Sequence, residues 1–250
     1  MVNVNNTLII IPTYNEEKNI RLLVEKIYFH VPGVNILFVD DNSKDATRHV
    51  IYALQKNSTK VSILERPEKL GLGSAYIAGF KWGIERGFTT LIEMDADHSH
   101  DPSYLPPFLG VLDKCDFVIG SRYVKDGGVR NWGIVRQMIS RFGSFYARFI
   151  LGKKVADFTG GYNVWNSKIF SQLNLDTIKS EGYSFQIELK YRAICEGFKY
   201  IELPIIFADR VAGKSKMSLR IILEAIMQVW AMRLATFKKS SHVADQSLHR

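Results

Sequence analysis

Two acidic residues one position apart follow a strongly apolar run near the middle of the chain. In LIEMDADHSHDP, residues 91 to 102, Asp95 and Asp97 come after LIEM, and His98 and His100 come directly behind them. The backbone leaves pleated geometry where a strand ends, so both carboxylates can turn toward one cation. Hard oxygen ligands suit Mg²⁺ or Mn²⁺, which take their other ligands from substrate phosphates and water. The pattern therefore predicts a divalent metal site.

The two histidines leave more than one interpretation open. Zinc requires a closed set of imidazole or thiolate ligands, and the sequence offers no further cluster of that kind. We therefore interpret HSHDP as a loop from which one histidine could reach the metal or the phosphates bound to it.

Positively charged residues supply the other half of the expected electrostatics. Arg122 follows a strand in GSRY, and Arg136 lies in NWGIVRQMISR. Arginine binds phosphate oxygens through two parallel hydrogen bonds, whereas lysine acts more as a point charge. After the strand-like YIELPIIF, the segment RVAGKSKM adds Arg210, Lys214 and Lys216 around a glycine that could act as a hinge. We expect this segment to form a mobile cover over phosphates.

Several common catalytic motifs do not occur in the sequence. GLGSAY, residues 71 to 76, has a tyrosine where a dinucleotide-binding fingerprint needs its third glycine. The chain contains no G-x-x-x-x-G-K-[ST] phosphate loop, and no Ser-His-Asp or Cys-His arrangement can be assembled from it. These observations argue against kinase-like and dehydrogenase-like functions.

The elements that must position these residues alternate between strands and helices. β-Rich runs and helical stretches follow one another at 8–11, 16–30, 35–41, 45–56, 61–66, 71–87, 89–97 and 117–123. This alternation indicates βαβ units, and hence an α/β fold with a mostly parallel central sheet flanked by helices. Ligands of such sheets bind beyond the carboxyl ends of the strands. The polar ends PTYNEE, VDDNSKDAT, ERPEKLGLG and MDADHSHDP are therefore expected to meet at one edge.

The composition is that of one globular domain with a basic surface. A chain of 250 residues, 46% hydrophobic and 23% charged, can bury one sizeable core. We expect a single domain over 1–237 and a flexible tail over 238–250. The formal net charge of +8 favours phosphate-bearing partners and leaves nucleic acid, an anionic membrane surface and a nucleotide open. Two distant cysteines and the lack of a signal-peptide pattern favour the cytoplasm.

A long apolar stretch near the C-terminus predicts an amphipathic helix over 218–237. Its polar residues recur about once per helical turn, which gives the helix a polar stripe and distinguishes it from a bilayer span. The helix could dock on the core of the domain, or it could lie in the plane of a membrane with Lys238 and Lys239 at its end. The stripe consists of Arg220, Glu224, Gln228 and Arg233.

An ordered series of motifs resembles one enzyme family, the polyprenyl-phosphate mannosyltransferases of the dolichol-phosphate-mannose type, in family 2 of the GT-A glycosyltransferases. The resemblance rests, in chain order, on PTYNEE, VDDNSKDAT, RPEKLGLGSAY, MDADHSHDP, GSRYV, SEGYSFQIEL and PIIFADRVAGKSKM, and it spans residues 7 to 235. The chain departs from the family pattern in two places. Asp45-Ala46-Thr47 stands where DGT is common, and DFTGGYNVW stands where a serine-glycine-phenylalanine pattern is common.

The resemblance implies a GT-A fold, GDP-mannose as donor, a polyprenyl (dolichyl-type) monophosphate as acceptor, and inversion at the anomeric carbon. It also implies that Mg²⁺ or Mn²⁺ binds at Asp95 and Asp97. Asp97, Arg122 and Arg136 would be the catalytic residues. The nucleotide-sugar site would comprise Pro12, Tyr14, Glu16, Asp41 and Asp95 with Arg210 and Lys216, and the acceptor phosphate would contact Arg122, Arg136 and Ser140.

The chemistry that the resemblance implies needs no catalytic base. A phosphomonoester is already ionised at neutral pH, since its second pKa is about 6. The protein must therefore supply positioning and charge stabilisation. A lipid acceptor implies peripheral attachment to the cytoplasmic face of a membrane, the endoplasmic reticulum in a eukaryote or the plasma membrane in a prokaryote. A membrane-embedded partner subunit is a further expected partner.

Two alternatives remain open at the level of sequence. The same fold could transfer glucose or N-acetylglucosamine from a UDP-sugar to a polyprenyl phosphate. The charge and aromatic residues such as Trp82, Tyr123 and Trp132 suggest nucleic-acid binding, but the sequence has no recognisable binding module or dense basic stripe. We therefore expect no nucleic-acid partner.

Overall fold

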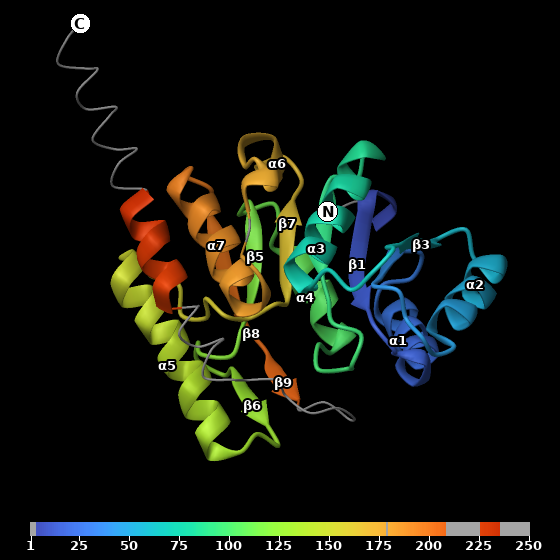
Figure 1. Cartoon of the computed structure of the whole chain (residues 1–250), viewed down its shortest axis with the longest axis horizontal. Helices are drawn as coiled ribbons and strands as arrows, with labels where there is room; N and C mark the ends of the chain where they lie inside the picture. The colour runs from blue at the N-terminus through green and yellow to red at the C-terminus, as the bar shows by residue number, and fades with distance from the viewer. Residues whose placement is uncertain (1–3, 179, 209–225, 236–250) are drawn as a thin grey trace, which may run out of the picture.

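The computed structural model describes residues 4–178, 180–208 and 226–235, which form a central sheet with helices on both faces (Figure 1). Three predictions fall wholly or partly outside the described residues. These are the phosphate cover with Arg210 and Lys216, the tail over 238–250, and both ends of the helix predicted over 218–237.

The central sheet has seven strands in the order β3-β2-β1-β4-β7-β5-β8. All neighbouring strands are parallel except β7, which runs antiparallel to both β4 and β5. The predicted α/β fold with a mostly parallel sheet is therefore confirmed. Strand β7 was not expected, because four residues with asparagine at both ends carry no strand periodicity. The strands are β1 (Thr7–Thr13), β2 (Asn35–Asp40), β3 (Val61–Glu65), β4 (Thr90–Glu93), β5 (Phe117–Ser121), β7 (Asn163–Asn166) and β8 (Tyr200–Pro204).

Hydrophobic side chains on alternating positions of β1 form the cores on the two faces of the sheet. Leu8 and Ile10 pack in the cluster that includes residues of α3, α5 and α7, whereas Ile9 and Ile11 pack in the cluster under α1, α2 and α4. This explains the unbroken apolar run, since a strand covered on both faces needs apolar residues at every position. The helices are α1 (Glu17–His30), α2 (Thr47–Asn57), α3 (Leu72–Glu85), α4 (Leu105–Gly110), α5 (Ile134–Leu151), α6 (Ile169–Gln172) and α7 (Gly182–Cys195).

The run YIELPIIF contributes to two sheets instead of one strand. Strand β8 ends at Pro204, and the N–H of Ile205 then donates to the carbonyl oxygen of Ser121 at 3.0 Å. Strand β9 (Ile206–Ala208) pairs in parallel with β6 (Gly128–Arg130) to form a second, two-stranded sheet. This small sheet lies beside the carboxyl ends of the parallel strands, next to the start of α5 (Figure 1).

Residues 226–235 form a helix, as predicted for this part of 218–237. Val229 is buried and belongs to the core cluster beneath α5 and α7, whereas Met227, Trp230 and Leu234 are exposed. One side of the helix therefore docks on the core, and the other side faces outward. None of the helices in the described part of the chain has the length and apolar character needed to cross a membrane.

Candidate active site at the carboxyl edge of the sheet

A pocket at the carboxyl edge of the sheet gathers residues that lie far apart in the sequence, as the rule for parallel sheets predicts. Ser140 does not line this pocket, and Arg210 and Lys216 lie outside the described residues. The predicted site residues that do line it are Pro12, Tyr14, Glu16, Asp41, Asp95, Asp97, Arg122 and Arg136.

Asp40, at the end of β2, ties together the loops that follow β1 and β2. Its Oδ1 accepts hydrogen bonds from Thr13 Oγ1 at 3.2 Å and from Ser43 Oγ at 2.5 Å. Ser43 Oγ in turn accepts from the N–H of Asn15 at 2.9 Å. Asp40 is wholly buried, so this carboxylate is structural.

Asp41 lines the pocket and pairs with Arg66, whose Nη1 lies 2.9 Å from Oδ1. Burial raises the pKa of Asp41 above its usual range, and the positive charge of Arg66 opposes that shift. Nearby, Lys69 Nζ lies 3.6 Å from the centre of the Tyr14 ring, and both residues line the pocket. A carboxylate and an aromatic face in one pocket suit the hydroxyl groups and the flat base of a nucleoside.

Asp95 and Asp97 both line the pocket directly beyond β4. Asp97 Oδ1 accepts hydrogen bonds from Ser99 N at 3.1 Å and from Ser99 Oγ at 2.6 Å. Asp95 Oδ1 accepts from Tyr76 Oη at 3.3 Å, and the Asp95 side chain keeps 24% of its surface exposed. Two carboxylates on one pocket wall provide the hard oxygen donors that suit Mg²⁺ or Mn²⁺.

The two histidines of HSHDP have different positions. The N–H of Asp95 donates to His100 Nδ1 at 2.9 Å, and the His100 ring stacks on Tyr162 with centroids 4.6 Å apart. His100 therefore holds the backbone of the loop that carries Asp95 and Asp97, and it also lines the pocket. His98 has a left-handed backbone with φ of 64° and does not line the pocket. Burial, with the charge of Lys26, lowers the pKa of His98.

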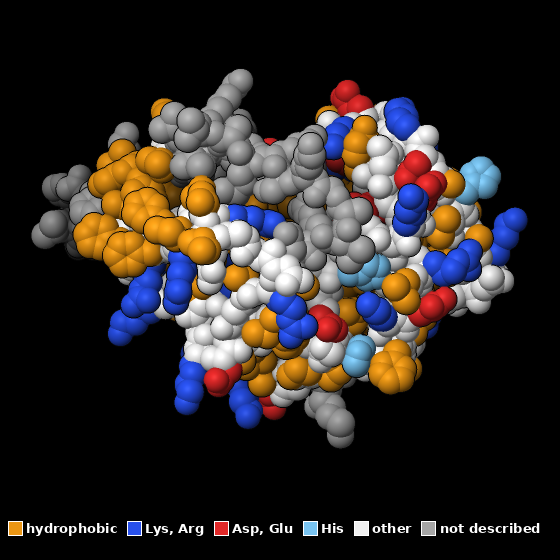
Figure 2. Space-filling view, turned by 90° about the horizontal axis from the view of Figure 1, so that it is seen from below, with side chains coloured by type: hydrophobic (Ala, Val, Ile, Leu, Met, Phe, Trp, Pro, Cys, Tyr) orange, Lys and Arg blue, Asp and Glu red, His pale blue; other side chains and the backbone are white. Residues whose placement is uncertain are grey.

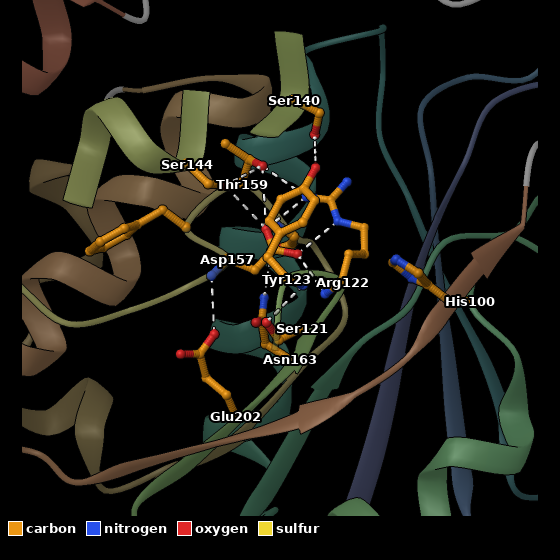
Figure 3. A network of polar contacts seen from close by, with 12 residues as sticks. His100, Ser121, Arg122, Tyr123, Ser140, Ser144, Asp157, Thr159, Asn163 and Glu202 are labelled. Atoms are coloured by element: carbon orange, nitrogen blue, oxygen red, sulfur yellow. Dashed lines mark hydrogen bonds and ion pairs between the residues drawn. The ribbon is translucent and has the colours of Figure 1, made fainter. Parts of the chain in front are cut away.

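Arg122 forms a buried ion pair with Asp157, a residue that the sequence analysis did not single out (Figure 3). Arg122 Nε and Nη2 each lie 2.7 Å from an oxygen of Asp157, and Nη2 also donates to Thr159 Oγ1 at 2.8 Å. Burial alone would raise the pKa of Asp157, but the charge and hydrogen bonds of Arg122 lower it to about 2. Attraction to Asp157 raises the pKa of Arg122 despite burial, which opposes the charge. Arg122 is therefore a permanently charged group in a fixed orientation.

Arg136 lies near the start of α5 with its guanidinium carbon 4.0 Å from the centre of the Trp132 ring. Both residues line the pocket, and Trp132 Nε1 has no hydrogen-bond partner among the described residues. Ser140, one turn further along α5, instead accepts a hydrogen bond from Tyr123 Oη at 2.7 Å. The predicted contact between Ser140 and an acceptor phosphate therefore lacks support from the pocket geometry.

Glu93, which ends β4 just before the loop that carries Asp95 and Asp97, lies beneath the pocket and is wholly buried. Its carboxylate accepts hydrogen bonds from Asn163 Nδ2 at 2.7 Å, Trp165 Nε1 at 3.0 Å and Gln186 Nε2 at 2.9 Å. Burial raises the pKa of Glu93 to about 7, although these bonds and the charge of Lys190 act in the opposite direction. The carboxylate thereby fixes Gln186, which lines the pocket.

Lys190 holds the segment that carries Thr159 and Gly161 to the pocket. Its ammonium group donates to the backbone oxygens of Phe158 and Gly160. Burial lowers the pKa of Lys190 to about 8, while the charges of Asp157 and Glu93 oppose the shift. The segment DFTGGYNVW, where the chain departs from the family pattern, thus supplies the ion-pair partner of Arg122 and part of the pocket wall.

Glu181 explains the segment GLGSAY, which does not match a dinucleotide fingerprint. Its carboxylate accepts from the N–H groups of Gly73 at 3.0 Å and Ser74 at 3.2 Å, in the first turn of α3. Gly71 has φ of +99°, and a Cβ there would lie 2.4 Å from Glu181 Oε2. An anion is stabilised at a helix N-terminus, and here the protein provides that anion itself. Glycine at position 71 is needed for this close approach.

We predict that Glu93→Gln makes the stability of the protein less dependent on pH. A pKa raised from 4.5 to about 7 means that unfolding releases a proton from Glu93 in this range. As pH rises from about 4.5 to about 7, the free energy of unfolding therefore falls by up to about 3 kcal/mol. The variant lacks this titration. Urea midpoints measured from pH 4.5 to pH 8 should therefore fall less in the variant than in the native protein.

The exposed Glu85→Gln provides the matched control for this measurement, and its curve should run parallel to that of the native protein. Parallel curves for Glu93→Gln and the native protein would show that Glu93 is ionised normally in the fold.

The comparisons with known proteins agree with this geometry. The chain is 44% identical over 231 residues to a polyprenol monophosphomannose synthase of Mycolicibacterium smegmatis, which covers 91% of this chain and 87% of that protein. It is 43% identical over 228 residues to an undecaprenyl-phosphate mannosyltransferase of Micrococcus luteus. This match covers 91% of this chain and 94% of that protein. A crystal structure of glucosyl-3-phosphoglycerate synthase from Mycobacterium tuberculosis, with Mn²⁺, UDP and phosphoglyceric acid, matches the fold with a TM-score of 0.63.

That solved structure is 19% identical in sequence, covers 92% of this chain and 78% of the other, and shows the likeness of fold alone. The model of glycosyl transferase family 2 matches residues 8–173. This match includes the pocket residues that lie in β1 or follow the ends of β1, β2, β4 and β5. The chain therefore belongs to glycosyl transferase family 2 and is a glycosyltransferase with a GT-A fold.

Proposed function

We propose that this enzyme transfers mannose from GDP-mannose to a polyprenyl monophosphate, with inversion at the anomeric carbon and with Mg²⁺ or Mn²⁺. The observation that carries the proposal is the gathering of Asp95 and Asp97 with Arg122 and Arg136 in one pocket. A donor diphosphate and its cation need the carboxylates, and an acceptor phosphate needs the arginines. Two relatives at 44% and 43% identity, named for mannose transfer to polyprenyl-type phosphates, support the same substrate classes here.

The carboxylates of Asp95 and Asp97 would hold the cation, which when bound neutralises the charge of the departing diphosphate. An oxygen of the acceptor phosphate then forms the new bond to the anomeric carbon while the bond to the diphosphate oxygen breaks. Because the acceptor oxygen is already ionised, no side chain has to remove a proton. The enzyme contributes position and a preorganised electrostatic field.

The two arginines would contribute differently to acceptor binding. The Nε and Nη2 of Arg122 are bonded to Asp157 and Thr159, and the carboxylate compensates much of its charge. Arg136 lies over the Trp132 ring, which restricts the directions of the guanidinium, and it lines the pocket. Because Arg122 already directs these donors to Asp157 and Thr159, we assign the main contact with the acceptor phosphate to Arg136, while Arg122 orients the wall of the pocket beside it.

In this proposal, the chemical nature of the acceptor determines where the enzyme works. A polyprenyl phosphate stays in a lipid bilayer, whereas a sugar nucleotide is dissolved in water. The enzyme would therefore work as a peripheral protein on the cytoplasmic face of a membrane.

Donor and acceptor can be tested together by mass analysis of the lipid product. The purified protein is incubated with a short polyprenyl phosphate, MnCl₂, and either GDP-mannose or UDP-glucose. We expect a product heavier by one hexose with GDP-mannose and little or none with UDP-glucose. Transfer only from the uridine nucleotide would replace the mannose proposal with the alternative of a UDP-sugar donor.

Asp97→Asn tests the metal site with little change of shape. Asparagine keeps an oxygen that can accept from Ser99, but it removes the negative charge. We expect transfer to fall by roughly 100-fold or more, because charge stabilisation at the leaving group is lost. The exposed Asp113→Asn is the control and should keep native activity. Native rates for Asp97→Asn in the presence of a chelator would exclude the metal assignment.

Arg136→Ala separates acceptor binding from donor binding. Removal of one charged phosphate contact should raise the KM for polyprenyl phosphate by roughly 10- to 100-fold, while the Kd for GDP-mannose changes by less than about threefold. Arg148→Ala, three turns further along the same helix and exposed, should leave both constants unchanged with a short, water-soluble acceptor. An equal weakening of both substrates by Arg136→Ala would contradict the assignment.

A further inference from the structure

Helix α5 exposes a row of large hydrophobic side chains. They recur every one to four residues along the helix and are between 62% and 76% exposed. The buried residues of this helix are Ser144, Ala147 and Leu151. Because a surface helix normally buries its larger hydrophobic residues, this arrangement is reversed and requires an explanation. The exposed residues are Ile134, Val135, Met138, Phe142, Phe145 and Phe149.

The helix over 226–235 extends this hydrophobic surface. Tyr146 Oη donates to the carbonyl oxygen of Ile226 at 3.5 Å, and a Cβ on Gly152 would lie 3.9 Å from Arg233 Nη1. The two helices therefore lie side by side, as Figure 1 also shows. Met227, Trp230 and Leu234 are 72%, 48% and 59% exposed. We call these three residues and the six exposed residues of α5 the α5 face.

Basic residues lie along an edge of the α5 face. Residues 128–154, which include α5, contain six Lys and Arg residues and no Asp or Glu, whereas the whole chain has 33 basic and 25 acidic residues. Figure 2 shows hydrophobic side chains gathered at the end of the molecule that holds α5, with Lys and Arg side chains along the edge of the patch. An apolar surface with a basic rim is complementary to an anionic bilayer, where apolar groups enter the interface and cations meet lipid phosphates.

We propose that the α5 face is the membrane-docking surface of this enzyme, with α5 lying in the headgroup region of an anionic bilayer. The proposal rests on the proposed function, because a lipid acceptor has to be reached from the membrane. It goes further in assigning the contact to α5 together with the outer side of the helix over 226–235. The sequence pattern alone pointed only to the C-terminal helix.

A second copy of the chain fits this surface less well than a bilayer does. In a two-fold dimer through α5, each basic rim would face an identical basic rim, and residues 128–154 offer no carboxylate to compensate. An anionic lipid surface provides that compensation for the basic residues along the edge. Charge complementarity therefore selects the bilayer.

The α5 face also continues into the pocket. Arg136 lies in the first turn of α5, between the exposed Val135 and Met138, and it lines the pocket together with Trp132. A phosphate bound at Arg136 would therefore lie at the border between the pocket and the docking surface. The hydrocarbon chain of the acceptor could remain in the bilayer while its phosphate enters the pocket.

The double variant Phe145→Ser/Phe149→Ser tests the proposal by sedimentation with vesicles. One set of vesicles contains equal amounts of phosphatidylglycerol and phosphatidylcholine, and the other contains phosphatidylcholine alone. We expect the native protein to bind the anionic vesicles more tightly, with an affinity that falls as salt rises. Loss of two exposed aromatic rings should weaken that binding by roughly tenfold or more. Phe29→Ser, 80% exposed on α1, is the matched control and should bind like the native protein.

Transfer to a short, water-soluble prenyl phosphate separates this proposal from the proposed function. The double variant should keep native transfer to that acceptor and native thermal stability, because neither phenylalanine lines the pocket. Absence of transfer by the native protein would refute the proposed function and leave the vesicle result to be judged by itself. Equal vesicle binding by the native protein and the double variant would refute the docking surface. So would light scattering that shows a native dimer and a monomeric double variant, since the α5 face would then be a self-association surface.

Discussion

The buried ion pair between Arg122 and Asp157 is the interaction on which the rest of the site depends. Removing two charges from water costs several kcal/mol for each ion, and only close geometry with further hydrogen bonds offsets that cost. Here Asp157 also accepts from the N–H groups of Arg122 at 3.0 Å and Gly160 at 2.9 Å, and its own N–H donates to Glu202 Oε1 at 3.0 Å. The end of β5, the loop before β7 and strand β8 are thereby locked to one another.

These contacts of Asp157 explain why a loop with two adjacent glycines can form a defined pocket wall. Lys190 binds two backbone oxygens of the loop from below, and Asn163 connects the loop to the buried carboxylate of Glu93. Glu93 ends β4, and the loop that carries Asp95 and Asp97 follows it. The negative half of the pocket at Asp95 and Asp97 and the positive half at Arg122 are therefore held by one connected set of buried polar groups. Such a prearranged field needs little reorganisation during reaction.

Helix α5 contributes both to the pocket and to the proposed membrane-docking surface. Helix α5 brings Arg136 to the pocket, buries Ser144 beside Asp157 and Thr159, and turns its large hydrophobic side chains outward. A serine inside and phenylalanines outside are the reverse of what core packing alone would favour. In the proposed function, this reversal aligns the entrance of the pocket with the lipid surface from which the acceptor comes. The charge of the surrounding segment then has a physical use beyond solubility.

The sequence by itself determined the alternation of strands and helices up to residue 123 and the edge at which the polar loops meet, because periodicity and strand ends are local properties. The family resemblance named eight residues that line the pocket, and most of them lie at or just beyond the carboxyl ends of parallel strands, where side chains converge. Only the tertiary structure showed that Asp157 pairs with Arg122, that Glu181 caps α3, and that Ser140 bonds to Tyr123. These partners lie 35, 108 and 17 residues apart, and no local pattern encodes which distant side chains folding brings within hydrogen-bonding distance.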